Sequence, residues 1–356
     1  MLTAAFAMFC YASPAEAQVE FRDSSFSEAL AAAQSTDSVV LVDVYATWCG
    51  PCQRLDEEVF STPALAEATA DVIALKIDAE SGEGPALVER YHVVGYPTIL
   101  VLTPDGIEID RIFGFMNTTD FVETLAGYRE GRGTITELAL AVAMDPTNIA
   151  LVSELASRNT IRGELVDAER LFAAVIAADA NNTQGLASHA YYWLGKYGYL
   201  RGASDPARAI AQFAEVIERY PDADEVLGAL IQSGIAAMRM EQDEQAQAFF
   251  ESAIAAAPEQ PELYNSIAFT VFHENRMLHW GISTAHRGLV IDPDNAGLLD
   301  TLAELHASAG DVEAALVAIE LAVEAAPGET YYQTQRAKFQ LMRDTRPREG
   351  DEGNGP

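Results

Sequence analysis

One pattern recurs five times over the last two-thirds of the chain, and it restricts the possible folds more than any other feature of the sequence. Each copy has a small residue, in four of the five copies a large residue four positions later, a second compact residue three positions after that, and usually a proline five positions further on. Small residues on one helical face let two helices pack closely, and a proline ends the second helix before the next pair begins. The sequence therefore predicts a stack of about five helix pairs. The first positions are Ala168, Ala209, Ala246, Gly281 and Ala315, which are 41, 37, 35 and 34 residues apart.

This pattern resembles the tetratricopeptide (TPR) repeat, in which each unit is a pair of helices. The resemblance implies an all-α solenoid over residues 137–328 and a capping helix at 329–343. Within the solenoid, residues 182–203 carry an insertion, and the charged, Gly- and Pro-rich residues 344–356 predict a disordered tail. Because such repeats hold peptides in a concave groove, the resemblance also implies a protein or peptide partner.

Residues 18–127 follow a different pattern, in which β-branched runs alternate with amphipathic segments. This order predicts a single α/β domain, and the Gly-rich residues 128–136 predict a linker to the repeats. The predicted strands are 38–45, 72–78, 98–103 and 107–113, and the predicted helices are 25–33, 49–59, a segment opened by Pro63, 83–91 and 117–126.

Cys49 and Cys52 lie at the start of the predicted helix that follows the first predicted strand. A thiolate at the start of a helix is stabilised by unpaired backbone N–H groups and by the positive end of the helix dipole. We therefore expect Cys49 to be exposed and nucleophilic, and Cys52, one turn later, to reach it. The alternative is half of a zinc site. The sequence offers no second cysteine pair to complete one, and His92 alone does not supply two ligands.

Trp48-Cys49-Gly50-Pro51-Cys52 matches the thioredoxin active-site motif without change, and the first domain resembles a thioredoxin. The resemblance implies a thioredoxin fold with a redox disulfide between Cys49, which attacks, and Cys52, which resolves. It also implies that Asp43 handles the proton, that Lys76 pairs with Asp43, and that Pro97 is a cis-proline beside the cysteines. It implies neither a cofactor nor a metal. The residues that it assigns to substrate binding are Trp48, Gly50, Pro51, Tyr96, Thr98 and Gly114.

A narrower resemblance, over residues 20–126, is to the C-terminal domain of the DsbD disulfide reductases. It rests on the segments that begin at Phe60 (Phe-Ser-x-Pro-x-Leu) and at Gly114 (Gly-Phe-Met). It implies protein-disulfide reductase activity on disulfide-containing clients. The sequence has no counterpart of the membrane electron-transfer domain of DsbD, so we expect an upstream thiol partner that donates electrons.

The direction of electron flow depends on two further cues. The Gly-Pro pair between the cysteines is typical of reductants, and the carboxylates of residues 56–58 disfavour a thiolate nearby. Both cues favour a reductase. Two alternatives remain open: an oxidase or isomerase, and a TPR scaffold or chaperone-like adaptor that uses the thioredoxin fold as a binding surface.

Charge and the N-terminal residues limit the partners and the location. With 54 Asp+Glu against 22 Lys+Arg, the formal net charge is −32, which repels nucleic acids and anionic lipid surfaces. Residues 2–12 are apolar and precede Ala15-Glu16-Ala17, so a signal peptide is predicted over residues 1–17. Its removal takes Cys10 away. The sequence thus predicts a periplasmic or otherwise exported protein with no membrane span in the mature chain.

Two sets of side chains in the repeats admit more than one interpretation. His279 and His286 could share a helical face, but no carboxylate or cysteine completes a ligand set, which favours solvated or capping histidines over a metal site. The aromatic residues of the insertion either pack between helices or line the peptide groove. They are Tyr191, Tyr192, Trp193, Tyr197 and Tyr199.

Overall fold

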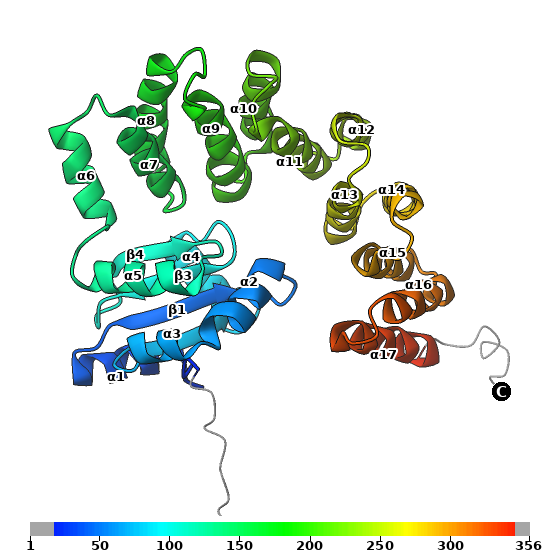
Figure 1. Cartoon of the computed structure of the whole chain (residues 1–356), viewed down its shortest axis with the longest axis horizontal. Helices are drawn as coiled ribbons and strands as arrows, with labels where there is room; N and C mark the ends of the chain where they lie inside the picture. Colours follow the sequence, from blue (N-terminus) through cyan, green and yellow to red (C-terminus); the bar gives the residue numbers. More distant parts are fainter. Residues whose placement is uncertain (1–17, 346–356) are drawn as a thin grey trace, which may run out of the picture. The chain divides into compact units, whose positions relative to one another are not determined.

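The computed structural model describes residues 18–345, which divide into two units, with the boundary in the sequence after Ala203. The predicted signal peptide and nearly all of the predicted tail lie outside the described residues. The predicted fold class is confirmed: a four-stranded mixed sheet flanked by helices is followed by helix pairs (Figure 1).

The first unit begins with the sheet, whose strand order is β2-β1-β3-β4. β1 runs parallel to β2 and antiparallel to β3, and β3 runs antiparallel to β4. The strands are β1 (Val40–Tyr45), β2 (Ile73–Asp78), β3 (Thr98–Leu102) and β4 (Glu108–Phe113), and the helices around them are α1 (Phe26–Thr36), α2 (Gly50–Leu55), the π-helical η1 (Asp56–Phe60), α3 (Pro63–Ala68), α4 (Gly84–Tyr91) and α5 (Thr118–Arg129).

Helices cover both faces of this sheet, because the strands are apolar on both sides. On one face, Val42 and Leu100 pack against α1 and α4. On the other face, Leu41 and Ile99 pack against α2, η1, α3 and α5. Side chains cap α1 and α5: Ser25 forms a capping box at α1, and Asn117 accepts a hydrogen bond from the N–H of Asp120 at α5.

The rest of the first unit is helical. The first residue of the first repeat copy, Ala168, is fully buried, as is Phe172. The predicted insertion is accommodated within a helix, since α9 runs directly into a second π-helical segment, η2. These elements are α6 (Ile135–Met144), α7 (Ile149–Thr160), α8 (Leu165–Ala178), α9 (Leu186–Trp193) and η2 (Leu194–Gly202).

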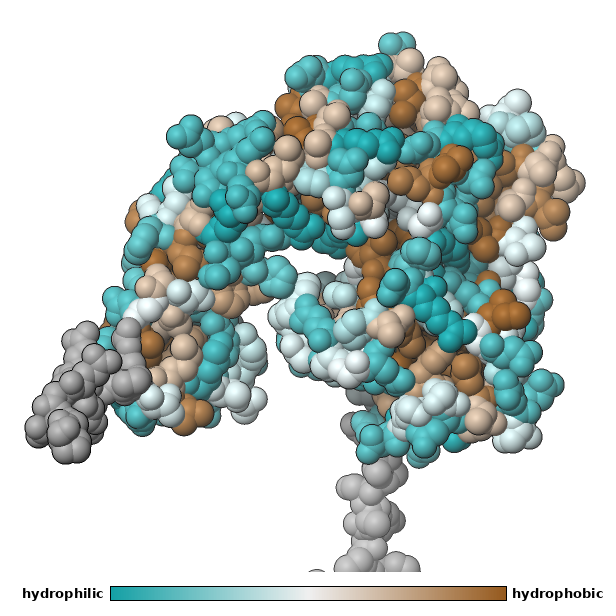
Figure 2. All heavy atoms as spheres, turned by 180° about the vertical axis from the view of Figure 1, so that it is seen from behind, coloured by the Kyte–Doolittle hydropathy of each residue, from teal (hydrophilic) through white to brown (hydrophobic). Residues whose placement is uncertain are grey.

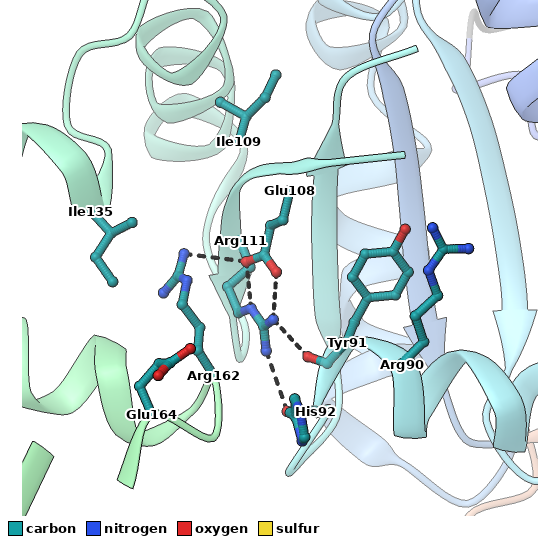
Figure 3. Close-up of a pocket in the computed structure, with 9 residues that line it drawn as sticks. All are labelled: Arg90, Tyr91, His92, Glu108, Ile109, Arg111, Ile135, Arg162 and Glu164. Atoms are coloured by element: carbon teal, nitrogen blue, oxygen red, sulfur yellow. Dashed lines mark hydrogen bonds and ion pairs between the residues drawn. The ribbon is translucent and has the colours of Figure 1, made fainter. Parts of the chain in front are cut away.

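An ionic cluster joins these helices to the edge of the sheet. Asp110 on β4 is fully buried and forms an ion pair with Arg162, and the Nη1 of Arg111 donates to the carbonyl oxygen of Ile161 at 2.7 Å. Glu108 also forms ion pairs with Arg111 and Arg162, at 2.6 Å and 3.3 Å. Glu108, Arg111 and Arg162 line a cavity of about 240 Å³, in which both guanidinium groups point toward Glu108 (Figure 3).

The second unit consists of further helix pairs, and its small residues set how closely the helices approach. A Cβ on Gly234 would lie 2.4 Å from the ring of Phe250, and one on Gly281 would lie 2.6 Å from Cγ1 of Val271. Any larger residue at either position would displace a buried neighbour. The helices are α10 (Pro206–Arg219), α11 (Glu225–Arg239), α12 (Asp243–Ala256), α13 (Pro261–His273), α14 (Leu278–Ile291), α15 (Ala296–Ser308), α16 (Val312–Ala325) and α17 (Thr330–Thr345).

On the face drawn in Figure 2, hydrophobic patches alternate with hydrophilic areas. Val166, Val290 and Met144 are among the exposed hydrophobic side chains, which is ordinary for a globular surface. Among the helices of residues 18–345, none combines the length and the apolar character that crossing a bilayer requires.

Candidate active site

The two cysteines are joined in a disulfide where β1 gives way to α2. Cys49 is the N-cap of α2, and its sulfur lies 3.2 Å from the backbone N–H of Cys52, which donates to it. Ala46, Tyr45 and Tyr96 pack around the pair. The expectation that Cys49 is exposed is wrong for this oxidised form, in which the residue is only 3% exposed. Its sulfur is covered because it is bonded to Cys52 and packed against these neighbours.

The loop before β3 lies beside the disulfide. The Tyr96–Pro97 peptide bond is cis, as the resemblance implies. The hydroxyl of the buried Thr98 donates to the carbonyl oxygen of Gly95 at 2.7 Å, and the N–H of Gly114 donates to the carbonyl oxygen of Pro97 at 2.9 Å. Gly114 has a φ of +82° and open space where a Cβ would point. Hydrogen bonds thus fix the loop at Gly95 and at Pro97.

Trp48 forms the exposed edge of this region. Its ring meets that of Tyr96 edge to face at 6.1 Å, and its Nε1 donates to Glu80 at 2.9 Å. The side chain is 42% exposed, and a Cβ on Gly50 would also meet open space. Trp48 and Tyr96 therefore form a partly exposed aromatic surface next to the cysteines.

Asp43 and Lys76 are paired across β1 and β2, where they occupy the same register position. Lys76 Nζ lies 3.6 Å from Oδ2 of Asp43, and neither carboxylate oxygen of Asp43 has a hydrogen-bond partner. Burial raises the pKa of Asp43 to about 7, opposed by the charge of Lys76 and reinforced by that of Asp56. Near neutral pH this carboxyl group can both take up and release a proton.

Asp56, considered so far only as one of three carboxylates near the cysteines, is itself a member of the site. Its carboxylate forms an ion pair with Lys76, so this one ammonium group lies between two carboxylates. Glu58 is likewise paired, with Arg54 at 2.9 Å. Two of the three carboxylates at residues 56–58 are therefore partly neutralised. They disfavour a nearby thiolate less than the sequence suggests, and so they favour a reductase less strongly. The only sequence signal for Asp56 is its position one helical turn after Cys52.

The structure places no metal-binding cluster near these residues. Within residues 18–345, no three His, Cys, Asp or Glu side chains are arranged to hold a metal ion. His189, in the insertion, shares a 3.1 Å hydrogen bond with the hydroxyl of Ser157, and His286 lies edge to face with His306.

The sheet order, the cysteine pair at a helix start and the adjacent cis-proline together define a thioredoxin-like domain of the disulfide oxidoreductase type. A model of the thioredoxin-like family matches residues 22–104. The thioredoxin of Staphylococcus aureus is 36% identical over 87 residues, which are 24% of this chain and 79% of that protein. The chain belongs to the thioredoxin family.

Two further comparisons concern longer proteins and the helices. The thiol:disulfide interchange protein DsbD of Pasteurella multocida is 34% identical over 96 residues, which are 26% of this chain and 17% of that protein. The chain spans less than a fifth of the length of the DsbD relatives it matches. The crystal structure of MamA protein is 17% identical with a TM-score of 0.38, covering 52% of this chain and 94% of that one.

Proposed function

We propose that this chain is a protein-disulfide reductase that acts on disulfide-containing clients. The observation that carries the proposal is the Cys49–Cys52 disulfide at the start of α2, packed against Tyr96 of the cis-proline loop. A pure scaffold needs neither a closely spaced cysteine pair nor a buried titratable carboxyl group such as Asp43.

In the reduced protein, the thiolate of Cys49 attacks one sulfur of a client disulfide, and the other client sulfur leaves as a thiolate. Cys52 then gives up its proton to Asp43 and attacks the sulfur of Cys49. This step closes the Cys49–Cys52 disulfide and releases the second client thiol. Two electrons pass to the client, and the protein ends oxidised.

The surrounding residues position the client and the proton carrier. The backbone around Pro97, between Tyr96 and Thr98, pairs with the client chain, and the open space at Gly114 admits it. Trp48, Gly50 and Pro51 form the surface over which the client disulfide reaches Cys49. Lys76 holds Asp43 in a state that can exchange protons near neutral pH.

Reduction of insulin by the purified mature chain, with dithiothreitol as electron source, tests this function. We expect catalysed reduction by the native protein and only the background rate with Cys49→Ser. Cys52→Ser is the matched variant: it should form a mixed disulfide but not turn over. Equal rates for the native and Cys49→Ser proteins would favour the scaffold instead.

A glutathione titration decides between a reductase and the oxidase or isomerase alternative. The DsbD relatives and the Gly-Pro pair favour a potential near that of thioredoxin, about −270 mV, rather than that of DsbA, about −120 mV. A measured potential above about −200 mV would reverse the proposed direction.

Export from the cytoplasm belongs to the same proposal and is supported by the predicted signal peptide alone. An exported reductant needs an upstream thiol donor, because the compartment is oxidising. Sequencing the N-terminus of the mature protein checks the export step. A start at Gln18 supports it, and a retained Met1 contradicts it.

A further inference from the structure

The π-helical segment η2 packs directly on the loop that carries Pro97. A Cβ on Gly95 would lie 3.0 Å from Nη1 of Arg201 and 3.1 Å from the ring of Phe113, and a Cβ on Gly202 would lie 3.6 Å from Cγ1 of Val94. Residues more than one hundred positions apart in the sequence therefore meet beside the cis-proline, within the first unit.

An aromatic cluster holds η2 in this position. Tyr197 contacts the ring of Phe113 at 5.1 Å and that of Trp193 at 4.6 Å. Trp193 is itself fixed, because its Nε1 donates to the carbonyl oxygen of Ser157 at 3.2 Å. Of the two interpretations of these aromatic residues, packing thus holds for Trp193 and Tyr197, and Phe113 of β4 is part of the contact.

Tyr197 also carries two cations on its ring. Nζ of Lys196 lies 4.9 Å from the ring centroid, and the guanidinium carbon of Arg201 lies 5.5 Å from it. Among residues 18–345, neither cation forms an ion pair with a carboxylate, although acidic residues outnumber basic ones by 54 to 22 in the whole chain. Arg201 is exposed, whereas Lys196 and Tyr197 are half-buried.

Tyr96, next to Pro97, lies within the electrostatic field of Arg201. Burial is the main reason that the pKa of Tyr96 is raised; the carboxylates of Glu80 and Asp78 raise it further, and the charge of Arg201 opposes them. Glu80 already accepts a hydrogen bond from Trp48. Arg201 therefore lies beside this loop without a carboxylate from residues 18–345 to pair with. An acidic residue of a bound client can form that pair.

We propose that Lys196, Tyr197 and Arg201 extend the client-binding surface beyond the thioredoxin fold, and that they select disulfide-containing segments with an Asp or Glu close to the reactive cysteine. The inference rests on the proposed function and names its substrate class. A guanidinium group binds a carboxylate through two parallel hydrogen bonds, and a cation fixed on an aromatic ring loses less side-chain freedom on binding. The acidic surface elsewhere repels such a client, so attraction at this point fixes its orientation.

The test uses three peptides that share one sequence and one intramolecular disulfide, with Glu, Gln or Lys beside the reactive cysteine. Each is reduced by the pre-reduced full chain in a single turnover, so no electron donor is needed. The readout is the ratio of second-order rate constants for the Glu and Lys peptides. We expect a ratio of about five in favour of Glu, which 0.5 M NaCl should reduce.

Variants of η2 and a matched control separate attraction from a structural effect. Arg201→Gln with Lys196→Gln should bring the ratio close to one, Arg201→Glu should invert it, and Arg201→Lys should keep its direction. Arg170→Gln is the control, because Arg170 is an exposed arginine of α8 paired with Asp167. It should leave the ratio as in the native protein.

The remaining outcomes separate failure of this inference from failure of the proposed function. If the native protein reduces the Gln peptide but shows no preference between Glu and Lys, the charge-selective surface is refuted and the proposed function stands. The same conclusion follows if the preference survives Arg201→Glu. If the native protein reduces none of the peptides, the proposed function fails, and this inference fails with it.

Discussion

Asp43 combines burial, a cation at ion-pair distance and the absence of any hydrogen bond to its carboxylate. It is 1% exposed, and Lys76, 3.6 Å away, is shared with Asp56. Desolvation therefore outweighs the attraction of Lys76 and raises the pKa of Asp43 to about 7. The same imbalance that suits this carboxyl group to proton exchange makes its charged form a cost to the folded protein.

This cost predicts how stability depends on pH. In the unfolded chain the pKa of Asp43 returns to about 3.9, so between about pH 4 and pH 7 only the folded state holds the proton. Stability therefore falls as the pH rises through this window, by on the order of 4 kcal/mol. Asp43→Asn should be more stable than the native protein at pH 8, and the difference should vanish near pH 4.

Urea unfolding of the oxidised protein at pH 4, 6 and 8 measures this dependence. Glu58→Gln is the matched variant, since Glu58 is an exposed partner of Arg54, and it should leave the pH dependence in place. A difference between Asp43→Asn and the native protein that stays constant from pH 4 to pH 8 would contradict the raised pKa.

At this scale, the sequence predicts the residues whose chemistry lies in a contiguous motif. Cys49 and Cys52 follow from the motif at residues 48–52, whereas Pro97 follows from the resemblance to thioredoxins. The pairing of Asp56 with Lys76 depends on how η1 and β2 come together, which no local pattern encodes. The burial of Cys49 likewise depends on neighbours, such as Tyr96, that are distant in sequence.

At the scale of elements, predicted and observed segments agree where one physical signal dominates. β1 is a β-branched run buried on both faces, and its position is predicted within two residues. The helix pairs follow from small residues such as Ala168 and Ala209, both fully buried. The π-helical form of η2 is not predicted, because its aromatic residues are held by Phe113 in the sheet domain.

The ion pairs between β4 and the helices after it should contribute to the stability of the first unit. Asp110 is fully buried, and Arg162 and Arg158 face it, the latter at 3.6 Å. Removing one partner of a buried ion pair leaves the other charge uncompensated. Asp110→Ala should therefore lower the free energy of unfolding by about 3 kcal/mol. Thermal or urea unfolding followed by tryptophan fluorescence, which includes Trp193, measures the change.

Asp71 provides the control for this substitution. It pairs with Arg129 at 2.5 Å but is 68% exposed, so Asp71→Ala should cost less than about 1 kcal/mol. Similar losses for the two variants would mean that the ionic cluster does not hold the helices to the sheet. The linker predicted at residues 128–136 follows from composition alone. Composition does not reveal that Asp110, before the linker, pairs with Arg162, after it.

At the scale of the whole molecule, the two units differ in the functional groups that they contain. The first unit contains the cysteine pair, the cis-proline loop and the cationic surface of η2, and the second contains most of the repeats. A second binding module on the same chain raises the effective concentration of a bound client, which increases overall affinity without any new contact at the cysteines. We therefore expect the second unit to act on client capture and not on the chemistry.

Truncation after Ala203 tests this expectation. The truncated protein should reduce insulin within about twofold of the full rate, because the reacting groups remain, but it should reduce the natural clients at least about tenfold more slowly. Those clients are the proteins trapped as mixed disulfides by full-length Cys52→Ala. Adding residues 204–345 as a separate chain should not restore the rate, since the effect depends on covalent linkage. Natural clients that are reduced equally fast by both forms would remove the repeats from client capture and leave them a role toward the electron donor.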